Sequence, residues 1–184
     1  MADGHKTPSE LVDYMITVGI DKATKPLFKL MLLGIFGGAF IALGGAGNII
    51  SASTLAKTDP GLAKFVGACV FPVGLIMVVI LGSELFTSNC LLSVAYTNKK
   101  INFTQLIRNL VTVYLFNYVG SFIVAYITVR GGSFNADSLD YLQNIATHKV
   151  HADAYALFIK GILCNVLVCG AVLLSYTSKD TIGK

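Results

Sequence analysis

Four long apolar runs constrain this chain more than any other feature of its sequence. They cover residues 29–51, 62–81, 103–129 and 154–176. A helix needs roughly 20 apolar residues to cross the hydrocarbon core of a bilayer, and each run is about that long or longer. Only 13% of the residues are charged, about half of what a soluble domain usually carries. The chain is therefore predicted to be an all-α membrane protein.

The second run is interrupted. It reads "FVGACVFPVGLIMVVIL", continues into the polar stretch "GSELFTSN" at residues 82–89, and ends with "CLLSVAY", which is too short to cross a bilayer alone. A helix that starts at Leu62 reaches Leu81 after about 28 Å, yet the next basic turn comes only at Lys99 and Lys100. We therefore predict a helix break around residues 82–87, inside the membrane. A short half-helix capped by Thr87 or Ser88 and a tail to Tyr96 would follow. The alternative is an interfacial loop after a helix that starts further out.

A break at membrane depth has chemical consequences. Unpaired backbone groups are tolerated there only when protein buries them or when they line a cavity. The N-terminus of a half-helix also offers N–H donors and partial positive charge, which favour an anion. Glu84 would be costly at this depth without partners, so we expect its carboxylate to accept backbone N–H bonds that hold the break. Its negative charge makes it unsuited to contact an anion.

Small and polar residues inside the runs indicate helix packing. The first run contains "GIFGGAFIALGGAG", and glycines at this density let helices approach closely in a membrane. Asn109 and Asn117, in the third run, are expected to bond across helices. The cysteines form no C-x-x-C pair and the histidines lie outside the runs, so we expect no cofactor and no metal site. The cysteines are Cys69, Cys90, Cys164 and Cys169.

Basic residues predict the orientation and the domain division. Lysines cluster in the N-terminal segment, in the turn around residues 97–104 and in the C-terminal tail, so the positive-inside rule places these segments in the cytoplasm. Residues 131–153 would form an outer loop with short helical content. We divide the chain into an N-terminal cytoplasmic or interfacial helix (1–28) and a transmembrane channel domain (29–184). Leu11, Met15 and Val18 lie on one face of the first helix, which could equally be an ordinary solvated helix. The net charge of +4 requires no nucleic-acid partner.

Three separated motifs carry a resemblance. "GSELFTSN", "HKVH" and "KGILCNVLVC" occur in this order, together with "GLAKFVGAC" and "GGAFIALG", and the sequence thereby resembles the formate/nitrite transporter family. This resemblance implies a homopentameric channel of the cell membrane for small monovalent anions such as formate, nitrite or hydrosulfide. Within this family, the sequence most resembles the hydrosulfide-channel branch. The family fold is an aquaporin-like bundle of six spans in two inverted halves. Because this chain holds four spans, we expect it to be a fragment that lacks a C-terminal segment, or to work with a companion chain.

The resemblance also implies roles for six residues. Thr87 would present the central hydroxyl to the passing anion, and Asn165 would lie near the pore and orient that centre. Lys149 would attract anions to the outer vestibule. Apolar constrictions along the pore would be formed by Phe71, Leu75 and Leu85.

Other functional classes are less well supported. A neutral-solute channel of the aquaporin or glycerol type would also use a broken helix, but the sequence contains no Asn-Pro-Ala motif. A non-transporting structural subunit is a further alternative. An intramembrane hydrolase would need a base beside Ser83 or Ser88; the histidines lie outside the spans and Glu84 is too close to Ser83 in sequence to serve. We therefore predict that the protein is not an enzyme.

Overall fold

The computed structural model describes residues 5–180 and is built from helices. They are α1 (Pro8–Thr24), α2 (Leu27–Ala52), η1 (Leu55–Lys57), α3 (Pro60–Val70), α4 (Pro72–Leu81), α5 (Phe86–Asn89), α6 (Leu92–Thr97), α7 (Phe103–Arg130), α8 (Ala136–Val150) and α9 (Ala154–Thr177). Extended pairing within the described range is limited to one isolated bridge between His5 and Ser178. The prediction of an all-α fold is confirmed.

Four helical segments are long and apolar enough to cross a membrane. They are Leu27–Ala52, Pro60–Leu81, Phe103–Arg130 and Ala154–Thr177. The second combines α3 and α4, which meet at Phe71 and Pro72. Each predicted run agrees with its helical segment to within two residues at either end. Length and hydropathy alone were sufficient for this prediction because a spanning helix must be apolar along its whole length.

Local capping explains where many of the helices begin. Thr7 and Glu10 form a capping box at α1, and Asn102 and Gln105 form one at α7. Asp59, Asn135 and Asp153 cap α3, α8 and α9 with side-chain oxygens. Such caps satisfy N–H groups that have no partner within the helix.

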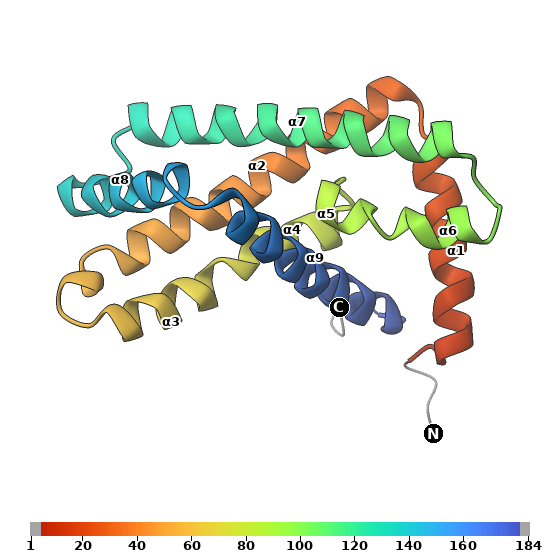
Figure 1. Cartoon of the computed structure of the whole chain (residues 1–184), viewed down its shortest axis with the longest axis horizontal. Coiled ribbons are helices and arrows are strands. Elements are labelled where there is room, and N and C mark those ends of the chain that lie inside the picture. The colour runs from red at the N-terminus through yellow and green to blue at the C-terminus, as the bar shows by residue number, and fades with distance from the viewer. Residues whose placement is uncertain (1–4, 181–184) are drawn as a thin grey trace.

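Helices α2 and α7 form the most extensive packed pair, and the glycines of α2 make this possible. A Cβ on Gly38 would stand 1.9 Å from the carbonyl oxygen of Asn117, and one on Gly37 would stand 2.1 Å from that of Glu84. The expectation that these glycines serve close helix packing is confirmed. Figure 1 shows α7 running along one side of the molecule with α2 crossing beneath it.

The short helices and turns that connect the long helices lie towards two opposite ends of the molecule (Figure 1). In Figure 1, α1 and α6 lie at one end, while α3, α8 and the turn between α2 and α3 lie towards the other. Segments predicted for the cytoplasmic side and for the outer side therefore separate in space. Which end faces the cytoplasm stays a prediction.

Two segments outside the four spans are more ordered than the sequence indicated. Residues 131–153 contain one helix, α8 (Ala136–Val150), which is longer than the short helical content predicted for this loop. Protein covers one side of helix α1, because its buried residues include Met15, Gly19 and Ala23 and it packs against α6, α7 and α9. Whether α1 lies at the membrane interface stays a prediction. Ala23 joins a buried cluster with Leu92 and Ala95 of α6. The division at residue 28 stays a prediction, with α1 packed on the remainder of the chain.

Candidate functional site at the helix break

The second membrane segment breaks where the polar stretch begins. Helix α4 ends at Leu81, and Gly82 takes a left-handed conformation with φ 72° and ψ 30°, which glycine adopts without strain. Residues 83–85 are not helical, and α5 starts at Phe86. The predicted break is thus confirmed, but the backbone unwinds at residues 82–85 and Thr87 lies in the first turn of α5. The predicted half-helix is two short pieces, α5 and α6, separated by Cys90 and Leu91.

A side chain from another helix caps α5. Leu85 is the N-cap residue and provides no side-chain oxygen. The Asn117 Oδ1 of α7 accepts a hydrogen bond of 2.9 Å from the Phe86 N–H. The prediction that Thr87 or Ser88 caps the half-helix is therefore wrong; the Ser88 hydroxyl instead donates to the Leu85 carbonyl. Because Asn117 uses the Phe86 N–H, this donor is not offered to an anion.

The Glu84 carboxylate binds lysines rather than backbone N–H groups. It lies 2.9 Å from the Lys22 Nζ and 3.5 Å from the Lys25 Nζ, both on α1. Glu84 is 2% exposed, so a charge there needs such partners. The expected role of its carboxylate was wrong. Its backbone does support the break, because the Glu84 N–H donates to the Leu33 carbonyl.

A buried amide pair continues this network behind α5. Asn89 is fully buried and donates to the Asn109 Oδ1 at 2.8 Å, while its own Oδ1 accepts from Lys22. Asn109 in turn donates to the Lys22 carbonyl. The prediction that Asn109 and Asn117 bond across helices is confirmed.

The Thr87 hydroxyl has no hydrogen-bond partner among the described residues, although its oxygen is buried. Buried hydroxyls are usually paired, so an orphan of this kind requires an explanation. Thr87 and Asn165 line the same hollow of about 690 Å³ between α5 and α9, whose walls also include Phe86, Phe158 and Cys169. The structure thus brings two of the predicted site residues together.

Asn165 links α9 to the half-helix through two thiols. Its Nδ2 lies 3.2 Å from the Cys90 Sγ, and its Oδ1 accepts from the Cys169 Sγ at 2.9 Å. Cys169 also lies 3.2 Å from the Thr87 carbonyl. These cysteines do more than fill space, because they connect α9 to the turn that carries Thr87.

The three predicted apolar residues occupy different surroundings. Leu85 is buried at 8% exposure in the break itself. Leu75 lines a separate hollow between α4 and α9, together with Val79 and Ala171. Phe71 is exposed at the α3–α4 junction. The structure does not bring them together as one ring, and their role as constrictions stays a prediction.

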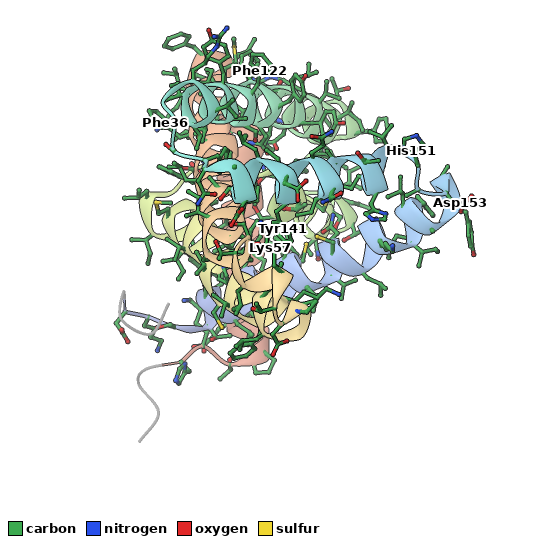
Figure 2. The ribbon with its side chains drawn as sticks, turned by 90° about the vertical axis from the view of Figure 1, so that its left-hand side faces the viewer. Phe36, Lys57, Phe122, Tyr141, His151 and Asp153 are labelled. Carbon is green, nitrogen blue, oxygen red and sulfur yellow. The ribbon has the colours of Figure 1, made fainter. Side chains whose placement is uncertain are left out.

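Lys149 lies far along the chain from this cluster, in the last turn of α8, and its side chain is exposed. Figure 2 shows the turn after α8, marked by His151 and Asp153, at the edge of the molecule opposite Phe36. The first turn of α8 is fixed to the end of α2 by a hydrogen bond of 2.9 Å between the Ser138 and Ser53 hydroxyls. The vestibule role of Lys149 stays a prediction.

Residues 9–184 match the sequence pattern of the family described as Formate/nitrite transporter. The chain belongs to the formate/nitrite transporter family. The resemblance inferred from the separated motifs is confirmed. The match includes the helix break with Thr87, the last turn of α8 with Lys149, and α9 with Asn165.

Relatives in this family are named as channels or transporters. The formate channel FocA of Haemophilus influenzae is 44% identical over 97% of this chain, and the formate channel BtFdhC of Bacillus thuringiensis is 38% identical over 98%. The chain spans 64% and 70% of the lengths of these proteins. Formate appears in both names, so a place in the hydrosulfide branch stays a prediction.

Solved structures of the formate/nitrite transporter family have the same fold. A structure described as an FNT family ion channel superposes with a TM-score of 0.83 at 28% identity, covering 95% of this chain and 71% of that one. A pentameric formate channel with formate bound gives a TM-score of 0.76 at 29% identity, covering 86% of this chain and 63% of that one. The broken-helix membrane bundle is therefore the fold of this family.

Proposed function

We propose that the protein containing this chain conducts small monovalent anions, such as formate, nitrite or hydrosulfide, past the Thr87 hydroxyl. Membership of the formate/nitrite transporter family and the names of the relatives support transport rather than catalysis. The single observation that carries the proposal is the buried Thr87 hydroxyl, which lacks a partner among the described residues and lines a hollow with Asn165. A passing anion would supply the missing partner.

A neutral hydroxyl is suited to this task. An isolated anion in hydrocarbon carries an idealised cost of tens of kcal/mol, so donors along the path must replace water. A full positive charge beside the path would hold the anion, whereas conduction requires binding weak enough for release. The Thr87 hydroxyl can donate to an anion and can also accept from a protonated weak acid. A neutral acid could therefore cross the apolar zones and still contact the same group.

Apolar side chains would provide selectivity. We place Leu85, Leu75 and Phe71 along the path, where constrictions would exclude hydrated ions by dewetting. Asn165 would hold the centre through its contacts with Cys90 and Cys169, which reach the turn that carries Thr87. Lys149 would raise the local anion concentration at the entrance.

We extend the proposal to the assembly. The solved relative described as a pentameric formate channel supports a homopentamer. Each protomer would lie in the cell membrane, and the distribution of basic residues favours a cytoplasmic N-terminus. The remaining spans of the inverted-repeat fold would close the path from the side of α9. Many apolar side chains of α9 are exposed in this chain, among them Phe158, Leu163 and Leu167.

Flux measurements in liposomes test the role of Thr87. The protein is expressed with all its spans and reconstituted as the wild type and as Thr87→Ser, Thr87→Val and Thr87→Ala, with formate, nitrite and hydrosulfide supplied separately. Thr87→Ser keeps the hydroxyl and should keep most of the flux, whereas Thr87→Val keeps the shape and should lose it. Equal flux in all variants would remove Thr87 from the mechanism. Water or glycerol flux without anion flux would favour a neutral-solute channel, and no flux at all would favour a structural subunit.

A further inference from the structure

We propose that Asn117 is a positioning residue, whose carboxamide fixes the first turn of α5 and thereby the direction of the Thr87 hydroxyl. This inference rests on the proposed function, because it gives the orientation of that hydroxyl its importance. Asn117 lies on α7, 30 positions along the chain from Thr87. It acts through the backbone and makes no contact with the anion.

The carboxamide makes three hydrogen bonds at the break. Its Oδ1 accepts from the Phe86 N–H at 2.9 Å, and its Nδ2 donates to the Gly34 carbonyl at 2.7 Å and to the Glu84 carbonyl at 2.9 Å. One side chain therefore ties the residues on both sides of Leu85 to α2 and α7. The first of these bonds holds the Leu85–Phe86 peptide group, one residue before Thr87.

The chain offers no local substitute for this cap. Leu85 lacks a side-chain oxygen, and the Glu84 carboxylate is turned towards Lys22 and Lys25. A helix of four residues has little cooperative stability of its own, so its direction depends on tertiary contacts. Asn117 supplies such a contact at the start of the first turn, where it accepts from the Phe86 N–H, and it also donates to the Glu84 carbonyl just before the helix.

The chemistry of an amide explains the residue type. Asparagine combines an acceptor and two N–H donors in a side chain short enough to meet three backbone groups, whereas leucine has neither and serine has a single hydroxyl. The group is also neutral. Aspartate could accept from Phe86, but its charge would oppose an anion near Thr87 and it would face the Gly34 and Glu84 carbonyls without a proton to donate.

The backbone around Asn117 leaves little room for adjustment. A Cβ on Gly37 would stand 2.1 Å from the Glu84 carbonyl oxygen and 3.2 Å from the Asn117 Nδ2. The break, α2 and α7 are thus in mutual contact at this point. Loss of the carboxamide would remove the bonds to the Phe86 N–H and the Glu84 carbonyl in a tightly packed place, and the short α5 is the element most able to move.

A double-mutant cycle separates positioning from a general contribution to stability. Formate flux is measured for the wild type, Asn117→Leu, Thr87→Ala and the double variant, normalised to correctly assembled protein. If Asn117 acts through Thr87, Asn117→Leu should lower flux by about fivefold or more in the wild type and by much less in the Thr87→Ala background. Equal losses in both backgrounds would overturn the proposal. If Asn117→Leu does not assemble, Asn117→Ser is used in the same cycle and judged by the same criterion.

Ser121 provides the matched control. It lies one turn further along α7, and its hydroxyl donates to the Gly38 carbonyl of α2 at 3.0 Å without touching the break. Ser121→Ala removes a bond between the same two helices, so it should change flux by less than about twofold and show no coupling to Thr87→Ala. Coupling as strong as that of Asn117 would mean that α2–α7 packing in general controls the site, which also overturns the proposal.

A labelling measurement tests the orientation without relying on transport. In a protein whose native cysteines are replaced by serine, so that positions 90 and 169 keep a hydrogen-bonding group, Thr87→Cys is treated with a small thiol reagent. Asn117→Leu should change the labelling rate by about fivefold or more, while Ser121→Ala should leave it unchanged. An unchanged rate in Asn117→Leu contradicts positioning. If Asn117→Leu changes the labelling rate but the protein conducts no anion, the positioning role of Asn117 is supported and the proposed function is rejected.

Discussion

The Lys22 ammonium of α1 lies 2.9 Å from the Glu84 carboxylate inside the helix break. The two residues are 62 positions apart in the chain, and Glu84 is almost completely buried. Lys22 also donates to the Asn89 Oδ1 at 2.7 Å, on the far side of α5. One lysine of the N-terminal helix thus binds Glu84, two positions before the start of α5, and Asn89, the last residue of α5.

Loss of Lys22 should therefore destabilise the fold strongly. Lys22→Met keeps most of the side-chain volume but leaves the Glu84 carboxylate with Lys25 at 3.5 Å as its remaining ion-pair partner. Breaking a buried ion pair from one side typically costs about 3–5 kcal/mol. We expect a lower thermal unfolding temperature in detergent than for Lys64→Met, since Lys64 is an exposed lysine of α3. Equal unfolding temperatures would show that the pair does not hold the break.

Close approach of α2 to the break gives a second prediction. Gly37→Ala places a Cβ 2.1 Å from the Glu84 carbonyl oxygen, and backbone atoms must move to admit it. Overpacking of this kind costs about 1–3 kcal/mol or more. Gly45→Ala, on the same helix, meets nothing within 4 Å and should be neutral or slightly stabilising because alanine favours the helix. Thermal unfolding of both variants checks the contrast, and similar losses in the two would contradict it.

Local pattern was enough to predict the spans and the position of the break. Spanning helices have to be apolar along their length, and the polar stretch that contains Gly82 and Thr87 cannot continue such a helix unaided. Local pattern could not predict which residues form the hydrogen bonds and ion pairs at the break. Glu84 binds lysines of α1 and Asn117 caps Phe86, and both contacts join residues far apart in the chain.

The apolar face of α1 illustrates the same limit. The spacing of Leu11, Met15 and Val18 predicts which residues share a face, but not whether lipid, water or protein covers it. In the structure α6 covers it, because small residues on both helices allow close contact: a Cβ on Gly19 would stand 2.7 Å from the Ala95 Cβ. The lysines at the end of α1 are then carried to the break.

Acid should weaken the attachment of α8 to η1. The Lys57 ammonium, hydrogen-bonded to the Asp137 carboxylate, holds the pKa of Asp137 below its ordinary value of 3.8. Above that value the contact contributes to stability, and the contribution is lost as the pH falls through the lowered pKa of the folded state. Both groups are solvent-exposed, so the effect should be small and should shrink with added salt.

The measurement compares the wild type with Asp137→Asn at two pH values. The wild type should unfold at a slightly higher temperature at about pH 6, and the difference should shrink as the pH is lowered and Asp137 becomes protonated. Asp140 lies on the same helix and acts on Lys57 through longer-range charge attraction, so Asp140→Asn serves as the control. A pH-independent difference between the wild type and Asp137→Asn would show that the charge of Asp137 is not responsible.

Charge reversal at Lys149 tests the proposed entrance. Lys149 is exposed at the end of α8 and is predicted to attract anions to the outer vestibule. Unit charges about 4 Å apart interact by about 1 kcal/mol even in water, so Lys149→Glu should lower anion flux about fivefold at low ionic strength. The difference should shrink near physiological salt, where the Debye length is about 8 Å. Lys64→Glu is the matched control, because Lys64 is also exposed and belongs to α3, which lies towards the same end of the molecule as α8 (Figure 1). Equal reductions in both variants would indicate a general surface potential, and unchanged flux in Lys149→Glu would remove this lysine from the entry step.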